Sequence, residues 1–406
     1  MVVSEDTRRR AHRTVPRRAL PLLLCTIVLA GCGVTQAQAP ESPSPVRAAV
    51  VDSVRAVLDR AYADSAFPGA YAIIGTSDTI LASMGVGHLD WAPSPAPDEN
   101  TMYDMASLSK VIGTTTAAMQ LWEDGRLDLD APVQRYLPNW VGRNKEKVTV
   151  RNLMTHSAGL PPFELFYKAG KNPAETLQMV YDTPLDTVPG ARMVYSDIGY
   201  MLMGEIVQHL TGTRLDHYLD QHVFRPLGMN STMYNPPATL LPRIAPTEFE
   251  EWRHGQVHGT VHDENAWALG GVAGHAGLFS TAHDMARFAR MMLHGGELDG
   301  VRVLQAKTIV TFTTVQDSTF SNRALGWEVP NGRNSAGHLL KSPAFGHTGF
   351  TGTSIWIDPS RDLFIVLLSN RVDPTRNNHR IGGVRVALAD AVVSAVDATR
   401  MVGARK

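Results

Sequence analysis

Ser107 and Lys110 form a Ser-x-x-Lys pair at the start of a segment that predicts a buried helix. Residues three apart lie on one face of a helix, so the serine Oγ and the lysine Nζ come within reach of each other. A serine hydroxyl needs a base beside it, and lysine becomes that base when burial lowers its pKa. The apolar neighbours Met105, Ala106 and Val111 could provide this burial. The pair predicts attack by Ser107 with Lys110 as base; the alternative is a helix start with Ser107 as N-cap and Lys110 in solvent.

A second candidate is Tyr195, in the segment Tyr195-Ser196-Asp197 that precedes an apolar helical run. A tyrosine on the loop before a helix can direct its hydroxyl into a cleft, where a nearby lysine ammonium would lower its pKa and let it shuttle a proton. The alternative is a packed tyrosine whose hydroxyl is satisfied by the backbone.

A third candidate is the glycine-rich run His347-Thr348-Gly349-Phe350, which leads toward a strand. Glycine lets the backbone approach a ligand closely, so N–H groups of this run could point at one oxygen atom. Two such donors form an oxyanion hole, which stabilises the negative charge that develops in acyl transfer. The alternative is a glycine-rich turn entering an edge strand.

In this order, the three motifs resemble the serine β-lactamase and penicillin-binding protein superfamily, whose signatures include Ser-x-x-Lys and Lys-Thr-Gly. The likeness is to its class C-type branch, which includes esterases, DD-peptidases and D-amino-acid peptidases. Four further segments resemble segments of this family, at residues 150–161, 224–232, 274–282 and 325–327. The resemblance covers roughly residues 47 to 400.

The resemblance implies a role for each candidate residue. Ser107 would be the acylated nucleophile, Lys110 its activating base, and Tyr195 the group that assists proton transfer to the leaving group. The backbone N–H groups of Ser107 and Phe350 would form the oxyanion hole. The wall that meets the substrate would be formed by Asp197, His347, Thr348 and Gly349. The resemblance implies neither a cofactor nor a metal ion.

Two residues depart from the family pattern. Asp197 stands where the family often has asparagine, and a carboxylate cannot donate a hydrogen bond to a substrate amide unless it is protonated. His347 replaces the lysine of Lys-Thr-Gly, and a neutral histidine supplies no positive charge for a substrate carboxylate. Both changes favour an esterase or a peptidase-like hydrolase over an efficient β-lactamase.

The elements that must position these residues come from both ends of the chain. Residues 46–62 predict a helix, and 71–75 and 79–85 predict two strands. Residues 353–358 and 363–370 predict another pair of strands, and 381–398 a last helix, whereas residues 115–290 read as helices and loops. We therefore expect an α+β fold: an antiparallel sheet built from both termini, flanked by the terminal helices, with a mainly helical lobe inserted. The catalytic domain should span residues 47–400.

The first 31 residues predict a lipoprotein signal peptide. Six arginines precede the apolar run 19–30, which is too short to span a bilayer. The run ends in Leu29-Ala30-Gly31-Cys32, which resembles a bacterial lipobox, so we expect lipidation of Cys32; ordinary cleavage is the alternative. Residues 32–46 would tether the domain to the periplasmic side of the envelope, with the outer membrane favoured. The sequence leaves the Sec and twin-arginine routes open.

The overall charge and the histidines limit other functions. Lysine plus arginine (38) nearly balances aspartate plus glutamate (39), so charge predicts no nucleic-acid partner. Five histidines lie close together in sequence and could suggest a metal enzyme: His254, His258, His262, His275 and His283. His258 and His262 have the i, i+4 spacing of helical ligands, but Gly259 and Thr260 are poor helix formers. We therefore expect these histidines to line a loop over the cleft.

The sequence thus predicts an exported serine hydrolase that forms an acyl-enzyme with an ester, a β-lactam or a D-amino-acid peptide. The alternative is a lipoprotein sensor that is acylated by penicillins or cell-wall peptides and does not turn over. The sequence does not identify the substrate; we expect the loops of residues 163–177 and 254–277 to select it.

Overall fold

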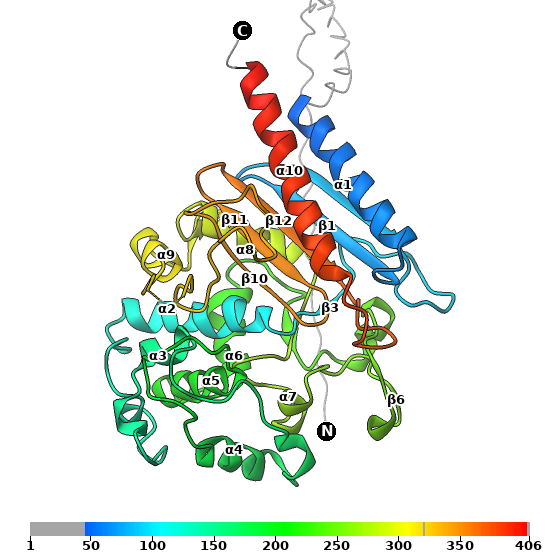
Figure 1. Ribbon diagram of the computed structural model, residues 1–406. Coiled ribbons are helices and arrows are strands. Elements are labelled where there is room, and N and C mark those ends of the chain that lie inside the picture. The colour runs from blue at the N-terminus through cyan, green and yellow to red at the C-terminus, as the bar shows by residue number, and fades with distance from the viewer. Residues whose placement is uncertain (1–44, 320, 404–406) are drawn as a thin grey trace, which may run out of the picture. The chain divides into compact units, whose positions relative to one another are not determined.

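A five-stranded antiparallel sheet joins the two ends of the described chain (Figure 1). The computed structural model describes residues 45–319 and 321–403. The order of the strands across the sheet is β10 (Phe345–Thr348), β11 (Ser354–Asp358), β12 (Leu363–Ser369), β1 (Gly69–Gly75) and β2 (Ile80–Gly87). This pairing of N-terminal with C-terminal strands confirms the predicted sheet.

The two central strands are buried on both faces. In β1, Tyr71 and Ile73 belong to one apolar core, while Ala72 and Ile74 belong to the other. Successive side chains of a strand point to opposite faces, so one strand contributes to both cores. The sheet is therefore a central layer, with a core on either side.

Helices cover the two faces of the sheet (Figure 1). On one face, α1 (Pro45–Ala63) packs against α10 (Ile381–Gly403), and both contribute to the smaller core. On the other face, α8 (Ala282–Leu293) packs against β1 and β12. The terminal helices flank the sheet as predicted.

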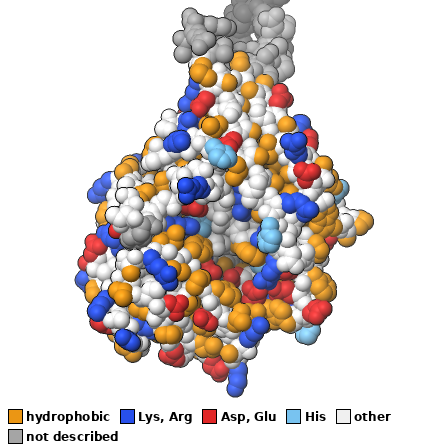
Figure 2. Space-filling model, viewed as in Figure 1, with side chains coloured by type: hydrophobic (Ala, Val, Ile, Leu, Met, Phe, Trp, Pro, Cys, Tyr) orange, Lys and Arg blue, Asp and Glu red, His pale blue; other side chains and the backbone are white. Residues whose placement is uncertain are grey.

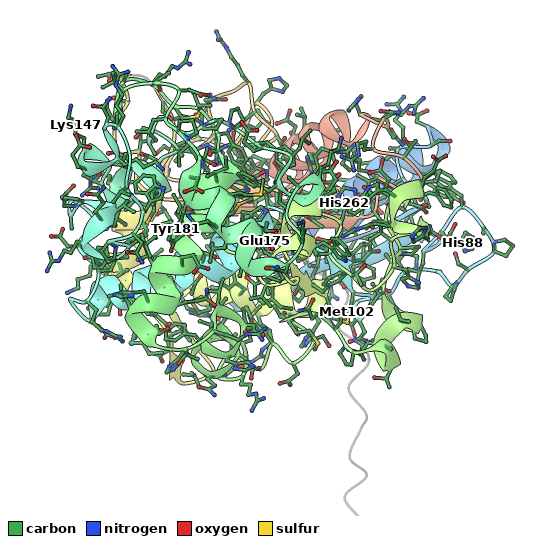
Figure 3. The ribbon with its side chains drawn as sticks, turned by 90° about the horizontal axis from the view of Figure 1, so that it is seen from below. His88, Met102, Lys147, Glu175, Tyr181 and His262 are labelled. Atoms are coloured by element: carbon green, nitrogen blue, oxygen red, sulfur yellow. The ribbon has the colours of Figure 1, made fainter. Side chains whose placement is uncertain are left out.

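The inserted lobe lies below the sheet in Figure 1 and consists mostly of helices. Its first helix starts beside the nucleophile candidate, with a π-helical stretch Lys110–Thr115 that continues as α2 (Thr116–Glu123). The other helices are α3 (Val150–Met154), α4 (Pro173–Asp182), α5 (Asp197–Thr211), α6 (Leu215–Leu219), α7 (Glu264–Ala268) and α9 (Ala306–Thr313). In the view from below, this lobe faces the viewer, with Glu175 and Tyr181 on α4 (Figure 3).

Short strands complete the lobe. One three-stranded sheet has the order β3 (Tyr103–Asp104), β7 (Leu278–Ser280) and β4 (Met233–Tyr234). Two hairpins pair β5 (Phe249–Glu250) with β6 (Gly255–Gln256), and β8 (Glu297–Leu298) with β9 (Val301–Arg302). Strand β3 matters most here, because the chain passes from it directly to Ser107.

The structure tests part of what was predicted for the N-terminal residues. Helix α1 begins at Pro45, so residues 45 and 46 are helical and do not belong to the predicted tether. The predicted signal peptide, Cys32 and the rest of the tether lie outside the described residues. Within residues 45–319 and 321–403, no helix combines the length and the apolar character that crossing a membrane requires.

Candidate active site

Ser107 follows a strained turn at the end of β3. Ala106 has a φ of 45°, a left-handed conformation that non-glycine residues rarely adopt. The turn is held by the Ala106 N–H, which donates to Asp104 Oδ1 at 2.8 Å. The Lys110 N–H then donates to the Ser107 carbonyl at 3.1 Å, which starts the helix. The strained turn thus places Ser107 at the start of a helix while its side chain remains partly exposed.

Lys110 is fully buried and lies among polar groups. Its Nζ donates to Ser107 Oγ at 3.0 Å and to the His275 carbonyl at 3.0 Å. The same Nζ lies 2.6 Å from Oδ1 of Asp197, the first residue of α5. The serine and lysine side chains lie close together, as predicted, and the Asp197 carboxylate contacts the lysine as well.

The expected lowering of the Lys110 pKa is wrong. Burial does act in that direction, but the Asp197 carboxylate and then Tyr195 outweigh it and hold the pKa of Lys110 above its ordinary value. The sequence argument considered only apolar neighbours in the chain. The structure adds a carboxylate 87 positions further along, which keeps the lysine protonated at neutral pH.

Tyr195 lies above this group, just before α5. Lys110 Nζ is 5.1 Å from the centre of the Tyr195 ring, and the centres of the Tyr195 and His156 rings are 4.4 Å apart. His156 Nδ1 also accepts the Ser196 N–H at 3.1 Å, and Ser196 caps the helix. His156 therefore orients the loop that presents Tyr195.

The His-Thr-Gly run occupies the end of an edge strand. His347 and Thr348 are the last residues of β10, which the sequence did not predict as a strand. His347 is buried, and its Nδ1 contacts the Thr348 carbonyl at 2.8 Å. Burial, together with the positive charges of Arg323 and Lys110, lowers the pKa of His347 well below its ordinary value. The residue that replaces the family lysine is therefore neutral.

The loop after β10 is fastened to the strand that carries the nucleophile. Thr351 Oγ1 donates to the Asp104 carbonyl at 2.7 Å, and Thr353 Oγ1 donates to the Met105 carbonyl at 3.1 Å. Gly349 permits this approach, since an added Cβ would lie 2.1 Å from Thr353 Oγ1. The two segments that bear the predicted oxyanion donors are thus joined directly.

The residues that bear the two predicted donors line a common cavity. Within the described chain, neither the Ser107 N–H nor the Phe350 N–H has a hydrogen-bond acceptor. Both residues line a cavity of about 780 Å³, together with Tyr195, His347, Thr348 and Gly349. Figure 2 shows this face hollowed near its centre, with charged side chains of both signs around the hollow. The structure therefore places Ser107, Tyr195 and Phe350 around one cavity, while Lys110 lies buried beneath it, within hydrogen-bond distance of Ser107 Oγ.

Arg323 is a residue of this cavity that the sequence analysis missed. Its guanidinium lies 5.2 Å from the Tyr195 ring on a side chain that is only 10% exposed. Its nearest carboxylate is Glu328, at 3.9 Å, and within the described residues its Nη1 has no hydrogen-bond partner. A buried guanidinium with unused donors can bind a carboxylate. Arg323 lies just before the segment 325–327 that resembles the family, but no spacing rule marked it.

The five histidines do not converge on one point. His254, His258 and His283 are exposed, His275 Nε2 contacts Asp263 Oδ1 at 2.8 Å, and His262 Nε2 contacts Glu248 Oε2 at 2.9 Å. Only one set in the described chain brings three metal-ligating groups together: Glu248, Glu250 and His262. Arg376 donates to both of these glutamates, at 2.6 and 2.7 Å, and so already supplies the positive charge there.

Comparisons with known proteins show the family of the chain. A family model described as "Beta-lactamase" matches residues 54–389. A "Putative D-alanyl-D-alanine carboxypeptidase" of Salmonella schwarzengrund is 38% identical over 305 residues, covering 67% of this chain and 70% of the relative.

Solved structures share the fold at lower identity. "EstCE1, a hydrolase with promiscuous acyltransferase activity" has a TM-score of 0.70 and 20% identity, covering 86% of this chain and 100% of that one. A penicillin-binding protein homologue from Caulobacter crescentus has a TM-score of 0.69 and 20% identity, covering 87% and 98%. A class C β-lactamase has a TM-score of 0.69 and 20% identity, covering 85% and 98%. These structures establish a common architecture.

Proposed function

Because this chain belongs to the β-lactamase family and is a serine hydrolase of that family, we propose that it cleaves peptides with a free C-terminal carboxylate through an acyl-enzyme at Ser107. Arg323 is the observation on which the choice of substrate rests. The cavity wall lacks the lysine of Lys-Thr-Gly, and His347 is neutral. Arg323 places a permanent positive charge in the same cavity, with an unused donor. The name of the Salmonella relative supports the same substrate class.

Acylation of Ser107 requires a proton to leave its hydroxyl. Ser107 Oγ attacks the carbonyl carbon of the scissile peptide bond, and its proton passes to the neutral amine of Lys110, 3.0 Å away. Since Asp197 stabilises the ammonium, only a fraction of molecules holds Lys110 neutral, and that fraction grows as pH rises. The rate of acylation should follow it.

Different groups stabilise the negative charge and protonate the leaving group. The carbonyl oxygen of the substrate becomes an oxyanion that accepts the N–H groups of Ser107 and Phe350. Collapse of the intermediate breaks the C–N bond, and the departing amine takes the proton from Lys110 through the Tyr195 hydroxyl. Water then hydrolyses the ester at Ser107 and restores the hydroxyl.

The substrate proposal is tested with two peptides that differ in one charge. The purified protein receives an acyl-D-Ala-D-Ala peptide and its C-terminal amide, and release of the last residue is measured. We expect the acid to be cleaved at least about tenfold faster, the effect of one charge-assisted hydrogen bond. Equal rates would reject recognition of the carboxylate.

The same assay separates the hydrolase from the sensor. Ser107→Ala should lose both turnover and labelling by a fluorescent penicillin, and persistent labelling would place the nucleophile elsewhere. One equivalent of released product without further turnover in the unmodified protein would favour the sensor over the hydrolase.

The cell-envelope location is a second proposal. The arginine-rich start, the apolar run 19–30 and the Leu-Ala-Gly-Cys sequence ending at Cys32 support export and lipidation. A tether after Cys32 would hold the hydrolase at the periplasmic side of the membrane, where cell-wall peptides with D-amino acids are found.

A further inference from the structure

Phe350 lies beside three charged or aromatic side chains although the residue is 47% exposed. The ring stacks on His262, with centres 5.6 Å apart and an angle of 29° between the planes. The guanidiniums of Arg371 and Arg376 lie over the ring, 4.5 and 5.8 Å from its centre. The residue that offers one of the two oxyanion donors is thus fixed by its side chain.

The peptide group after Phe350 is fixed as well. Arg371 Nε donates to the Phe350 carbonyl at 2.8 Å, and Arg371 Nη1 donates to the carbonyls of Arg376 and Asn378 at 2.7 and 2.8 Å. A change in the backbone at residue 376 would therefore move the Arg371 guanidinium, which holds the Phe350 carbonyl.

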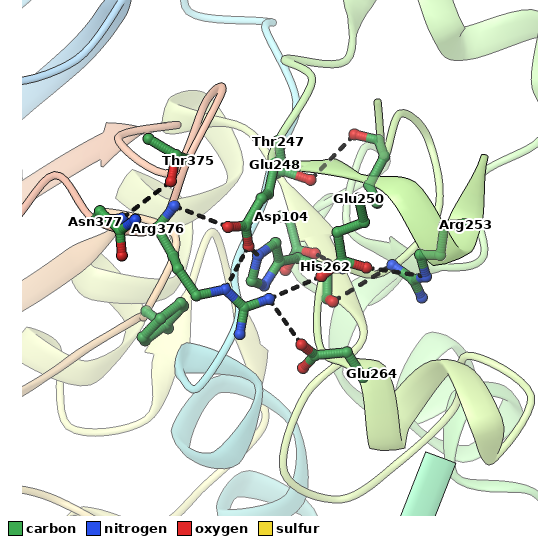
Figure 4. Close-up of polar contacts among 12 residues, drawn as sticks. Asp104, Thr247, Glu248, Glu250, Arg253, His262, Glu264, Thr375, Arg376 and Asn377 are labelled. Atoms are coloured by element: carbon green, nitrogen blue, oxygen red, sulfur yellow. Dashed lines mark hydrogen bonds and ion pairs between the residues drawn. The ribbon is translucent and has the colours of Figure 1, made fainter. Parts of the chain in front are cut away.

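Arg376 uses its backbone and its side chain together (Figure 4). Its N–H donates to Glu248 Oε1 at 2.9 Å and its Nε to Glu248 Oε2 at 2.6 Å. Its Nη2 donates to Glu250 and to Glu264, both at 2.7 Å. Three carboxylates on two separate segments thus fix one arginine, which is a strong arrangement because charge-assisted bonds are short and directional.

The acidic segments lead back to the nucleophile. Glu248 also contacts His262 Nε2 at 2.9 Å, and the His262 N–H donates to Asp104 Oδ2 at 2.6 Å. Burial alone would raise the pKa of Glu248, but His262 and Arg376 outweigh it and lower the pKa, so the carboxylate is charged. Asp104 holds the turn before Ser107, and its carbonyl accepts Thr351 Oγ1. A continuous set of contacts therefore links the turn before Ser107 to the loop that carries Phe350.

We infer that Arg376 is a positioning residue for the oxyanion hole, which fixes the Phe350 N–H relative to the Ser107 N–H. It does so through the Phe350 ring, through Arg371, and through Glu248 and His262 to Asp104. The inference rests on the proposed acyl-enzyme at Ser107 but not on the identity of the substrate. Arg376 itself does not line the cavity that holds Ser107 and Phe350.

The experiment compares Arg376→Gln with Arg380→Gln. Arg380 is an exposed arginine four residues further along, and within the described chain it makes no contact with Phe350. Both variants are assayed for acylation by p-nitrophenyl acetate and for affinity toward m-aminophenylboronic acid, which forms a tetrahedral adduct with the serine. Removing an oxyanion donor costs about 10²–10³ in kcat, so displacing one should cost at least about tenfold.

The expected result is a kcat and a boronate affinity at least about tenfold lower in Arg376→Gln, with KM for the ester little changed and Arg380→Gln unaffected. A purely structural role would lower the unfolding temperature without weakening boronate binding by the folded fraction. If Arg376→Gln does not fold, it is replaced by Arg376→Lys, which keeps the charge but loses the paired donors. We expect kcat and boronate affinity to fall in this variant as well.

Normal boronate affinity and kcat in a folded Arg376 variant would overturn the inference while leaving the hydrolase intact. Failure of the proposed function gives a different result, since Ser107→Ala would then keep its acylation by the ester. The two failures are therefore distinguishable.

Discussion

Lys110 Nζ lies closer to the carboxylate of Asp197 than to the hydroxyl that it is expected to activate: 2.6 Å to Asp197 Oδ1 and 3.0 Å to Ser107 Oγ. An amine between a nucleophile and a carboxylate is held in its charged form. The resting site is therefore a partly buried ion pair beside a protonated serine, and pH determines what fraction of molecules holds Lys110 as a neutral base.

Asp197→Asn should move the pH dependence of acylation. The substitution removes the charge that holds the pKa of Lys110 high and leaves burial, which lowers it. The wild-type kcat/KM should keep rising with pH into the alkaline range, whereas the variant should reach its plateau about 1–3 pH units lower. The measurement is kcat/KM for p-nitrophenyl acetate from pH 6 to 10.

Glu205→Gln is the matched control for this experiment. Glu205 is another acidic residue of α5, and within the described residues it bonds only to Gln208. Its variant should keep the wild-type profile. An Asp197→Asn profile that coincides with that of the wild type would show that the ion pair does not control the base.

Local sequence patterns predicted most of the sheet and its flanking helices, because these elements are determined largely by residues close together in the chain. The apolar run of β1 and the periodicity of α1 and α10 depend on residues at most four positions apart. Strand β10 was missed because its four residues include a glycine and lie at the sheet edge. Its assignment depends on pairing with β11, which sequence periodicity does not show.

The residues of the candidate site that belong to sequence motifs were predicted, whereas the contacts between charged residues from distant segments were not. Ser107, Lys110 and Tyr195 belong to recognisable motifs, and the structure brings them together. The Asp197–Lys110 ion pair and the position of Arg323 beside Tyr195 depend on contacts between distant segments. The pKa of Lys110 was misjudged for this reason, since its sign depends on a distant partner.

Arg323→Gln should weaken recognition of the substrate carboxylate. The loss of one charge-assisted hydrogen bond costs about 1.5–3 kcal/mol, so kcat/KM for an acyl-D-Ala-D-Ala acid should fall roughly ten- to hundredfold. The rate with p-nitrophenyl acetate, which has no carboxylate, should change much less. Arg333→Gln serves as control, because Arg333 lines the same cavity but is exposed. Equal losses for the two substrates would assign Arg323 to the support of Tyr195.

Asp373→Asn should change the pH dependence of stability. Burial, followed by the nearby charge of Asp90, raises the pKa of Asp373 to about 7. A carboxyl whose pKa is higher in the folded state favours folding while protonated, and this contribution is lost as pH rises toward and through 7. The amide still accepts the Gln256 donor, which lies 2.9 Å from Oδ1. The variant should therefore gain stability over the wild type between pH 5 and pH 8.

Unfolding temperatures at pH 5, 6.5 and 8 check this expectation. Asp59→Asn, on an exposed position of α1, provides the comparison. A difference between Asp373→Asn and the wild type that stays constant with pH would rule out titration of Asp373 in this range.

Cys32→Ser should release the protein from membranes. If lipidation at Cys32 anchors the chain, the substitution removes the acyl chains that bind the bilayer, while the catalytic domain is untouched. The measurement is the distribution of esterase activity between the membrane and soluble fractions of cells. Cys25→Ser, in the apolar run, is the control and should remain with the membrane fraction. An unchanged distribution for Cys32→Ser would exclude an anchor at this residue.

Gly349→Ala should slow acylation of Ser107 by displacing the loop that carries the Phe350 N–H. The added methyl group would lie 2.1 Å from Thr353 Oγ1 and 2.5 Å from the Met105 carbonyl oxygen, so the loop must move away from the strand that leads to Ser107. Such overpacking costs about 1–3 kcal/mol of stability, and displacement of the Phe350 N–H should lower kcat at least about tenfold. Gly382→Ala is the control: it is in the first turn of α10 with no atom within 4 Å of its added Cβ. Unfolding temperature and acylation rate should be normal in that variant, and a normal rate in Gly349→Ala would show that the loop can shift without disturbing the donors.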